Sequence, residues 1–79
     1  MKMNENIRIC EINGIMYASI KDMLSTLTNL NVNYVWTQLK QQFPIIHDMY
    51  INFKLPGAKR TTPIANYENL INIIQFLHH

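Results

Sequence analysis

Apolar and polar residues alternate along the N-terminal part of the chain. Residues 7–12 read Ile-Arg-Ile-Cys-Glu-Ile, a period of two that is typical of a half-buried strand, with Cys10 behaving as a small apolar residue. Asn13 and Gly14 follow, and both tolerate the positive φ of a type I′ turn. Residues 15–18 then form the return strand. The pattern predicts a β-hairpin.

The apolar spacing changes to a helical one after this hairpin. Ser19 stands three residues before Asp22, close to the capping-box pattern, and an acid in the first turn suits the positive end of a helix. Apolar residues then follow at helical spacing, which predicts a helix over 20–27; they are Ile20, Met23, Leu24 and Leu27.

A second helix is indicated by one continuous apolar stripe. Asn31 is placed to cap its start, and Pro44 forces Phe43 out of helical geometry and ends it. The stripe consists of Val32, Val35, Trp36, Leu39 and Phe43. The opposite face is polar and carries no acid: Asn33, Tyr34, Thr37, Gln38, Lys40 and Gln41.

The next segment favours a second hairpin. Residues 45–50 have no clear period, whereas residues 51–55 alternate as a strand does. Pro56-Gly57 is a turn signal, and residues 60–65 would return. Pro63 has no amide donor, so we expect that strand to lie at an edge of the sheet or to stop there.

A last helix is predicted over 67–77, capped by Asn66 and with Glu68 well placed for the helix dipole. Its apolar residues cover half of its circumference or more, which is broader than a helix on one side of a small core needs. We therefore expect it to be central, or to be covered by something outside this chain.

Together these elements predict a small α+β domain, in the order β-β-α-α-β-β-α, with two hairpins packed with three helices. The chain of 79 residues is one domain, and its composition is that of a globular protein. No apolar run is long enough to cross a bilayer, and the polar N-terminus does not resemble a signal peptide. A single cysteine fits a reducing cytosol or nucleus.

The two terminal histidines are set apart from the domain. His78-His79 is more typical of a purification-tag remnant than of a functional pair, so the domain is taken as 1–77.

Catalytic chemistry finds little support in the sequence. Cys10 lies in a predicted strand, where a lone cysteine usually packs in the core. His47-Asp48 could orient a general base, but neighbours in an irregular segment more often face solvent. No Cys-x-x-Cys or His-x-x-x-His pattern suggests a metal, and two isolated glycines do not make a phosphate loop. We expect no enzyme, metal or cofactor.

Binding to a polyanion is better supported. Between Asp48 and Glu68 the chain carries three cations and no acid: Lys54, Lys59 and Arg60. In a hairpin around Pro56-Gly57 these cations gather near the tip, where they could neutralise phosphates. Charges in a turn also serve simply to keep it soluble, and the net charge of +2 is too small to decide.

The polar face of the second helix adds to this expectation. Amide side chains pair with adenine edges, threonine contacts a thymine methyl, and lysine reaches a phosphate or guanine. The face offers that set as Asn33, Thr37, Gln38, Lys40 and Gln41. An ordinary solvated face has the same composition. Trp36 lies on the apolar stripe and is interpreted as a core residue.

The order of these pieces resembles the BRO-N family, which was named for repeated baculovirus genes and occurs also in phage antirepressors and bacterial mobile elements. Each motif is short, but their order and spacing extend from about residue 7 to 76. The stretches that carry the resemblance are Ile7-Arg8, Asn13-Gly14-Ile15-Met16-Tyr17, Asp22, Leu27-Thr28, Tyr34-Val35-Trp36-Thr37-Gln38-Leu39-Lys40, Phe53-Lys54-Leu55-Pro56, Lys59-Arg60-Thr61-Thr62 and Ala65-Asn66-Tyr67-Glu68-Asn69-Leu70-Ile71-Asn72-Ile73-Ile74-Gln75.

The resemblance implies a double-stranded DNA-binding module of a viral, phage or mobile-element regulator, in a bacterial cytoplasm or a host nucleus. The family pattern usually continues into another helix, so this chain is interpreted as truncated at its C-terminal end. A second copy could then cover the last helix, with Ile73, Phe76 and Leu77 as a homodimer interface. The alternative is an antirepressor-like module that binds a protein regulator through the same surface.

Overall fold

The computed structural model describes residues 6–78. The remaining N-terminal residues, which we judged unlike a signal peptide, and His79 lie outside the described residues. None of the described helices is long and apolar enough to cross a membrane.

The first half of the chain has the predicted elements. Strands β1 (Ile9–Ile12) and β2 (Ile15–Ser19) form an antiparallel hairpin, which leads directly into helix α1 (Ile20–Leu27) and then helix α2 (Val32–Gln42). Asn13 has φ 54° and Gly14 φ 83°, which confirms a turn that requires positive φ at both positions.

The second half contains one element that the sequence did not reveal. Residues 44–48, within the unassigned segment, form a 3-10 helix, η2 (Pro44–Asp48). Strand β3 (Ile51–Phe53) and strand β4 (Thr62–Asn66) follow, and helix α3 (Tyr67–Leu77) ends the described fold. The predicted strands are therefore shorter or shifted: Leu55, Arg60 and Thr61 lie in the loop between β3 and β4.

The predicted helix starts are confirmed by their caps. The side chain of Ser19 accepts a hydrogen bond from the backbone amide of Asp22 at 3.2 Å. Asn31 accepts from Tyr34 at 3.0 Å, and Asn66 accepts from Asn69 at 2.9 Å. Each bond satisfies one of the amides that a first helical turn leaves free.

The two hairpins join into one antiparallel sheet with the strand order β1-β2-β4-β3. Strand β4 is therefore central, and the expectation that the strand of Pro63 lies at an edge is wrong. Proline is tolerated there because β2 pairs with β4 only from Ile64 to Asn66, so Pro63 has a neighbouring strand on one side alone, opposite Asn52.

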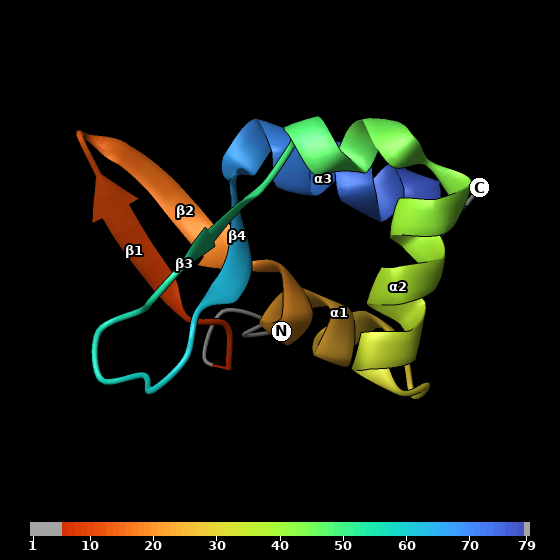
Figure 1. Ribbon diagram of the computed structural model, residues 1–79, viewed down its shortest axis with the longest axis horizontal. Coiled ribbons are helices and arrows are strands. Elements are labelled where there is room, and N and C mark those ends of the chain that lie inside the picture. The colour runs from red at the N-terminus through yellow and green to blue at the C-terminus, as the bar shows by residue number, and fades with distance from the viewer. Residues whose placement is uncertain (1–5, 79) are drawn as a thin grey trace.

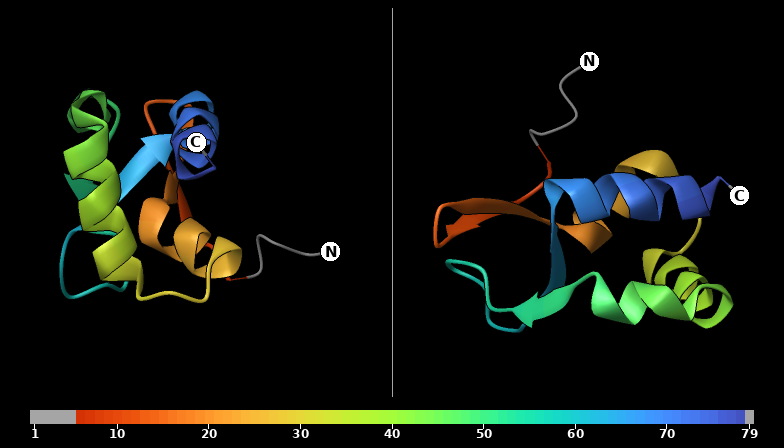
Figure 2. Two further views of the ribbon diagram at one scale, coloured as in Figure 1. Left: turned by 90° about the vertical axis from the view of Figure 1, so that its right-hand side faces the viewer. Right: turned by 90° about the horizontal axis from the view of Figure 1, so that it is seen from above.

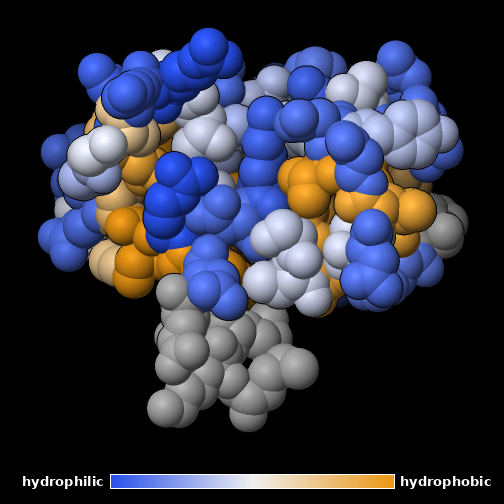
Figure 3. Space-filling model, turned by 90° about the horizontal axis from the view of Figure 1, so that it is seen from below, coloured by the Kyte–Doolittle hydropathy of each residue, from blue (hydrophilic) through white to orange (hydrophobic). Residues whose placement is uncertain are grey.

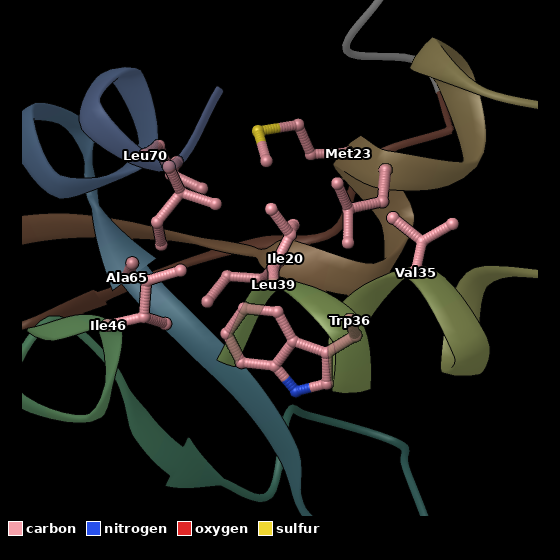
Figure 4. Packing of buried hydrophobic residues seen from close by; sticks show 10 residues of the cluster. Ile20, Met23, Val35, Trp36, Leu39, Ile46, Ala65 and Leu70 are labelled. Carbon is pink, nitrogen blue, oxygen red and sulfur yellow. The ribbon is translucent and has the colours of Figure 1, made fainter. Parts of the chain in front are cut away.

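The helices lie against one side of the strongly twisted sheet, and the hairpin β1–β2 and the β3–β4 loop extend on the other (Figure 1). Trp36, Leu39 and Val35 of α2 meet residues of α1, β4 and α3 in the core, as Figure 4 shows. Trp36 is only 4% exposed, which confirms it as a core residue. Cys10 is half-buried and does not belong to this core.

Candidate nucleic-acid interface

The loop between β3 and β4 is held at its base and open at its tip. Leu55 is buried, and the backbone amide of Ala58 donates to the carbonyl of Leu55 at 2.9 Å. This closes a turn at Pro56-Gly57, in which Gly57 has φ 81°, a conformation that favours glycine. The turn at residues 55–58 is therefore defined, although the loop projects from the sheet.

The three predicted cations of this loop remain available. Lys54, Lys59 and Arg60 are all exposed. Among residues 6–78, Arg8 and Asp22 form an ion pair, whereas Lys54, Lys59 and Arg60 form none. No acid lies between Asp48 and Glu68 in the sequence.

The polar face of α2 is also open, but not uniformly. Asn33, Thr37 and Gln41 are exposed, whereas Gln38 and Lys40 are half-buried. The ammonium of Lys40 lies 5.2 Å from the centre of the Trp36 ring, a distance at which the ring attracts the cation. Lys40 is thus held toward the core tryptophan.

One exposed aromatic residue on this face was not among the predicted site residues. Tyr34 is 60% exposed, and it follows Asn33 in the first turn of α2. The helical period already placed Tyr34 opposite the apolar stripe. Its exposure was not predictable, because it depends on which other elements pack against the helix.

The loop and α2 stand at the two ends of the long axis of the molecule (Figure 1), but both border the same long side, with β3 and η2 between them (Figure 2). Both views of Figure 2 agree on this arrangement. Seen from below, apolar residues gather in separate areas divided by hydrophilic ones, and no single apolar patch covers this face (Figure 3). The loop that carries the predicted cations and helix α2 therefore border one side of the molecule, but they are separated along it and are not adjacent.

Helices α1 and α2 are joined by the short segment 28–31 and pack on each other through buried residues. They run in clearly different directions (Figure 1). Two helices that run in different directions and are joined by a short turn are a common supersecondary motif, which helix-turn-helix proteins also use.

The predicted dimer interface needs correction. Ile73 is 0% exposed because it lies in the core of its own chain. Phe76 and Leu77 are half-buried and pack against the same core, and the ring of Phe76 stacks on that of Phe43 at 4.5 Å between centroids. Much of the broad apolar surface of α3 is therefore covered by other residues of the same chain.

The structure gives no support to catalysis by His47 and Asp48 or to a metal site among the described residues. His47 and Asp48 are both exposed at the end of η2. Among the described residues no three histidine, cysteine or acidic side chains come together in a way that could hold a metal ion.

Comparison with known proteins gives no match, either to a family model, to a curated protein or to a solved structure. The described residues form a small α+β domain in which α1 and α2 run in different directions and an exposed basic loop joins β3 to β4. Membership of the BRO-N family stays a prediction from the sequence.

Proposed function

We propose that the domain binds double-stranded DNA, as the DNA-binding module of a viral, phage or mobile-element regulator. In this proposal Lys54, Lys59 and Arg60 contact phosphates, and the exposed face of α2 lies in a groove. The kind of regulator is inferred from the resemblance to the BRO-N family alone.

The observation that carries the proposal is the charge of the β3–β4 loop. Three exposed cations without an acidic partner among residues 6–78 stand on a loop that is anchored by buried Leu55 and turns at Gly57. Because their side chains are open to solvent, phosphates of a duplex can reach them.

The position of α2 supports a groove contact. Its N-terminal half presents Asn33, Tyr34 and Thr37 to solvent, and residues at the start of the second helix are those that reach base edges in helix-turn-helix proteins. No acid stands in the first turn of α2, so nothing there repels a phosphate. Asn33 and Thr37 are the proposed base contacts.

Lys40 and Gln38 take a smaller part in this proposal. Lys40 lies against the ring of Trp36, so it would have to leave that ring before it reached a phosphate. Gln38 is half-buried. We assign both to the border of the interface and Gln41 to its exposed part.

The class of function is tested by a titration of a duplex DNA with the protein at two salt concentrations. Phosphate contacts release condensed counterions, so each contact lowers the logarithm of the affinity by about 0.9 per logarithmic unit of salt. The proposal predicts binding at low salt with a clear salt dependence. Absence of binding at low salt contradicts it.

A further inference from the structure

A hollow of about 200 Å³ opens between the start of α3 and the junction of η2 with β3. It lies apart from the loop cations and from the outer face of α2, since no residue of either lines it. The lining residues come from five elements and the segment between η2 and β3: Tyr17, Asp48, Met49, Tyr50, Ile51, Asn66 and Asn69.

The walls of this hollow are fixed by contacts within the chain. Tyr17 and Asn66 are direct partners on β2 and β4, so their side chains lie on the same face of the sheet. The side-chain amide of Asn69 donates to the carbonyl of Met49 at 3.1 Å, which ties α3 to the segment before β3. The ring of Tyr50 packs edge-on against Trp36 at 5.1 Å.

The polar groups of the hollow include donors and acceptors. Asn66 accepts from the backbone amide of Asn69 with its side-chain oxygen, which leaves its amide nitrogen as a donor, and both tyrosines carry hydroxyl groups. Asp48 supplies a carboxylate that forms no ion pair with any cation of residues 6–78. Asn69 uses its amide nitrogen for Met49, which leaves its side-chain oxygen as an acceptor. The tyrosines add two rings, and Ile51 and Met49 add apolar surface. The combination is one negative charge beside aromatic faces.

We propose that this hollow binds the guanidinium group of an arginine side chain from a partner polypeptide. A guanidinium is planar, presents five donors in a fixed fork, pairs with a carboxylate through two parallel hydrogen bonds and stacks on aromatic rings. Asp48 would take the fork, and Tyr17 and Tyr50 would lie along the plane.

Other ligands match the hollow less well. A lysine ammonium is a compact and strongly hydrated point charge that cannot match a carboxylate with a planar fork of donors. A phosphate is repelled by the carboxylate of Asp48. The hollow therefore gives the domain a second, oppositely charged contact, and this inference does not depend on DNA binding.

The test uses the isotopically labelled chain and three small probes, followed by chemical shifts of the backbone amides. The probes are N-acetyl-arginine amide, N-acetyl-citrulline amide, which is its uncharged isostere, and Nα-acetyl-lysine amide. We expect the arginine probe to bind in the millimolar range, because one half-open ion pair contributes only about 1 kcal/mol. Its shifts should centre on residues 48–51 and 66–69.

Asp48→Asn should weaken the arginine probe about fivefold, the ratio that corresponds to such an ion pair. Glu11→Gln removes the same charge from strand β1, away from the hollow, and should leave the affinity unchanged. Both variants should keep the dispersed spectrum of the folded chain, since Asp48 and Glu11 are exposed.

Three results would overturn the inference: equal binding of the citrulline probe, equal affinity of Asp48→Asn and the parent chain, or shifts that map outside the hollow. Equal binding of the lysine probe would also overturn it and would indicate a site for any cation. None of these results bears on whether the loop cations bind DNA.

Discussion

Arg8 and Asp22 form a two-pronged ion pair that joins the start of β1 to the first turn of α1. The Nε of Arg8 donates to Oδ2 of Asp22 at 2.7 Å, and a terminal guanidinium nitrogen donates to Oδ1 at 3.1 Å. The backbone amide of Arg8 also donates to Oδ2, at 3.0 Å. One carboxylate thus holds both the backbone and the side chain of a residue 14 positions away.

Replacing this carboxylate should destabilise the fold. Asp22→Asn should lower the free energy of unfolding by about 1–2 kcal/mol, since it removes a charged and partly buried acceptor of three hydrogen bonds. Urea unfolding followed by circular dichroism measures the change. Arg8→Lys keeps the charge but not the fork, and should cost less than Arg8→Gln. Equal stability of Asp22→Asn and the parent chain would show that the pair contributes nothing.

The same pair makes stability depend on pH. Burial raises the pKa of Asp22, but the hydrogen bonds and charge of Arg8 outweigh burial and hold that pKa below its ordinary value of 3.8. A pKa that is lower in the folded chain means that the contribution is complete above the unfolded value and is lost as the pH falls through the folded one.

The difference in unfolding free energy between the parent chain and Asp22→Asn should therefore be constant near neutral pH and should shrink below about pH 4. Urea titrations at neutral and acid pH measure it. A difference that grew on acidification would have the wrong sign for this ion pair.

Two isoleucines of α3 separate its buried side from its exposed side. Ile73 is 0% exposed and Ile71 is 45% exposed. Ile73→Ala should cost about 2–5 kcal/mol through lost burial and a cavity, whereas Ile71→Ala should change stability by no more than about 0.5 kcal/mol. Thermal or urea unfolding compares them.

A chain this small has little stability to lose, so Ile73→Ala could fail to fold. Ile73→Val, with an expected cost of about 1 kcal/mol, keeps the comparison measurable. Similar costs at both positions would contradict the burial of Ile73 in its own chain.

The turn of the β3–β4 loop depends on Gly57. An added Cβ would meet no atom within 4 Å, so the cost of a substitution comes only from φ 81°. Gly57→Ala should destabilise by about 1 kcal/mol, and Gly57→Asn by less, because asparagine adopts this conformation more readily. Urea unfolding of both variants measures the order, and an alanine variant as stable as the parent would contradict a fixed turn.

Local sequence signals were sufficient for the helices. The caps Ser19, Asn31 and Asn66 and the stop at Pro44 act over one turn, so the bounds of all three predicted helices agree with the structure. The turn at Gly14 was equally local. The fold class and the order of the elements were therefore predictable.

The relations between distant segments were not predictable. The pairing of β2 with β4 joins Ala18 to Ala65, and no local pattern specifies it. The strand of Pro63 was wrongly expected at a sheet edge because this pairing was not predicted. Alternation likewise tells which residues share a face, but not which face is covered, so Ile9 is 57% exposed although it belongs to an apolar pattern.

Some features of the candidate site were predictable from local sequence, and others depend on tertiary packing. The cations Lys54, Lys59 and Arg60 were evident because they are neighbours in the sequence, and the polar face of α2 was evident from its period. The contact of Lys40 with Trp36, the burial of Ile73 and the hollow beside Asp48 depend on tertiary packing. Those features were therefore not predictable from the sequence.

The role of the loop cations is tested by two triple variants. Lys54→Gln, Lys59→Gln and Arg60→Gln together remove the charge, whereas Lys54→Arg, Lys59→Arg and Arg60→Lys together keep it. All three positions are exposed, so both variants should fold, which a circular dichroism spectrum checks. Phosphate contacts require charge more than the particular side chain.

The decisive measurement is the affinity of the parent chain and both variants for one duplex DNA, by fluorescence anisotropy, over salt from about 50 to 200 mM. The account predicts that the uncharged variant binds more weakly on every duplex tested and that its salt slope is smaller by roughly 3, while the charge-conserving variant binds nearly as the parent does. An uncharged variant with the parent's affinity and salt slope would contradict a DNA contact by the β3–β4 loop.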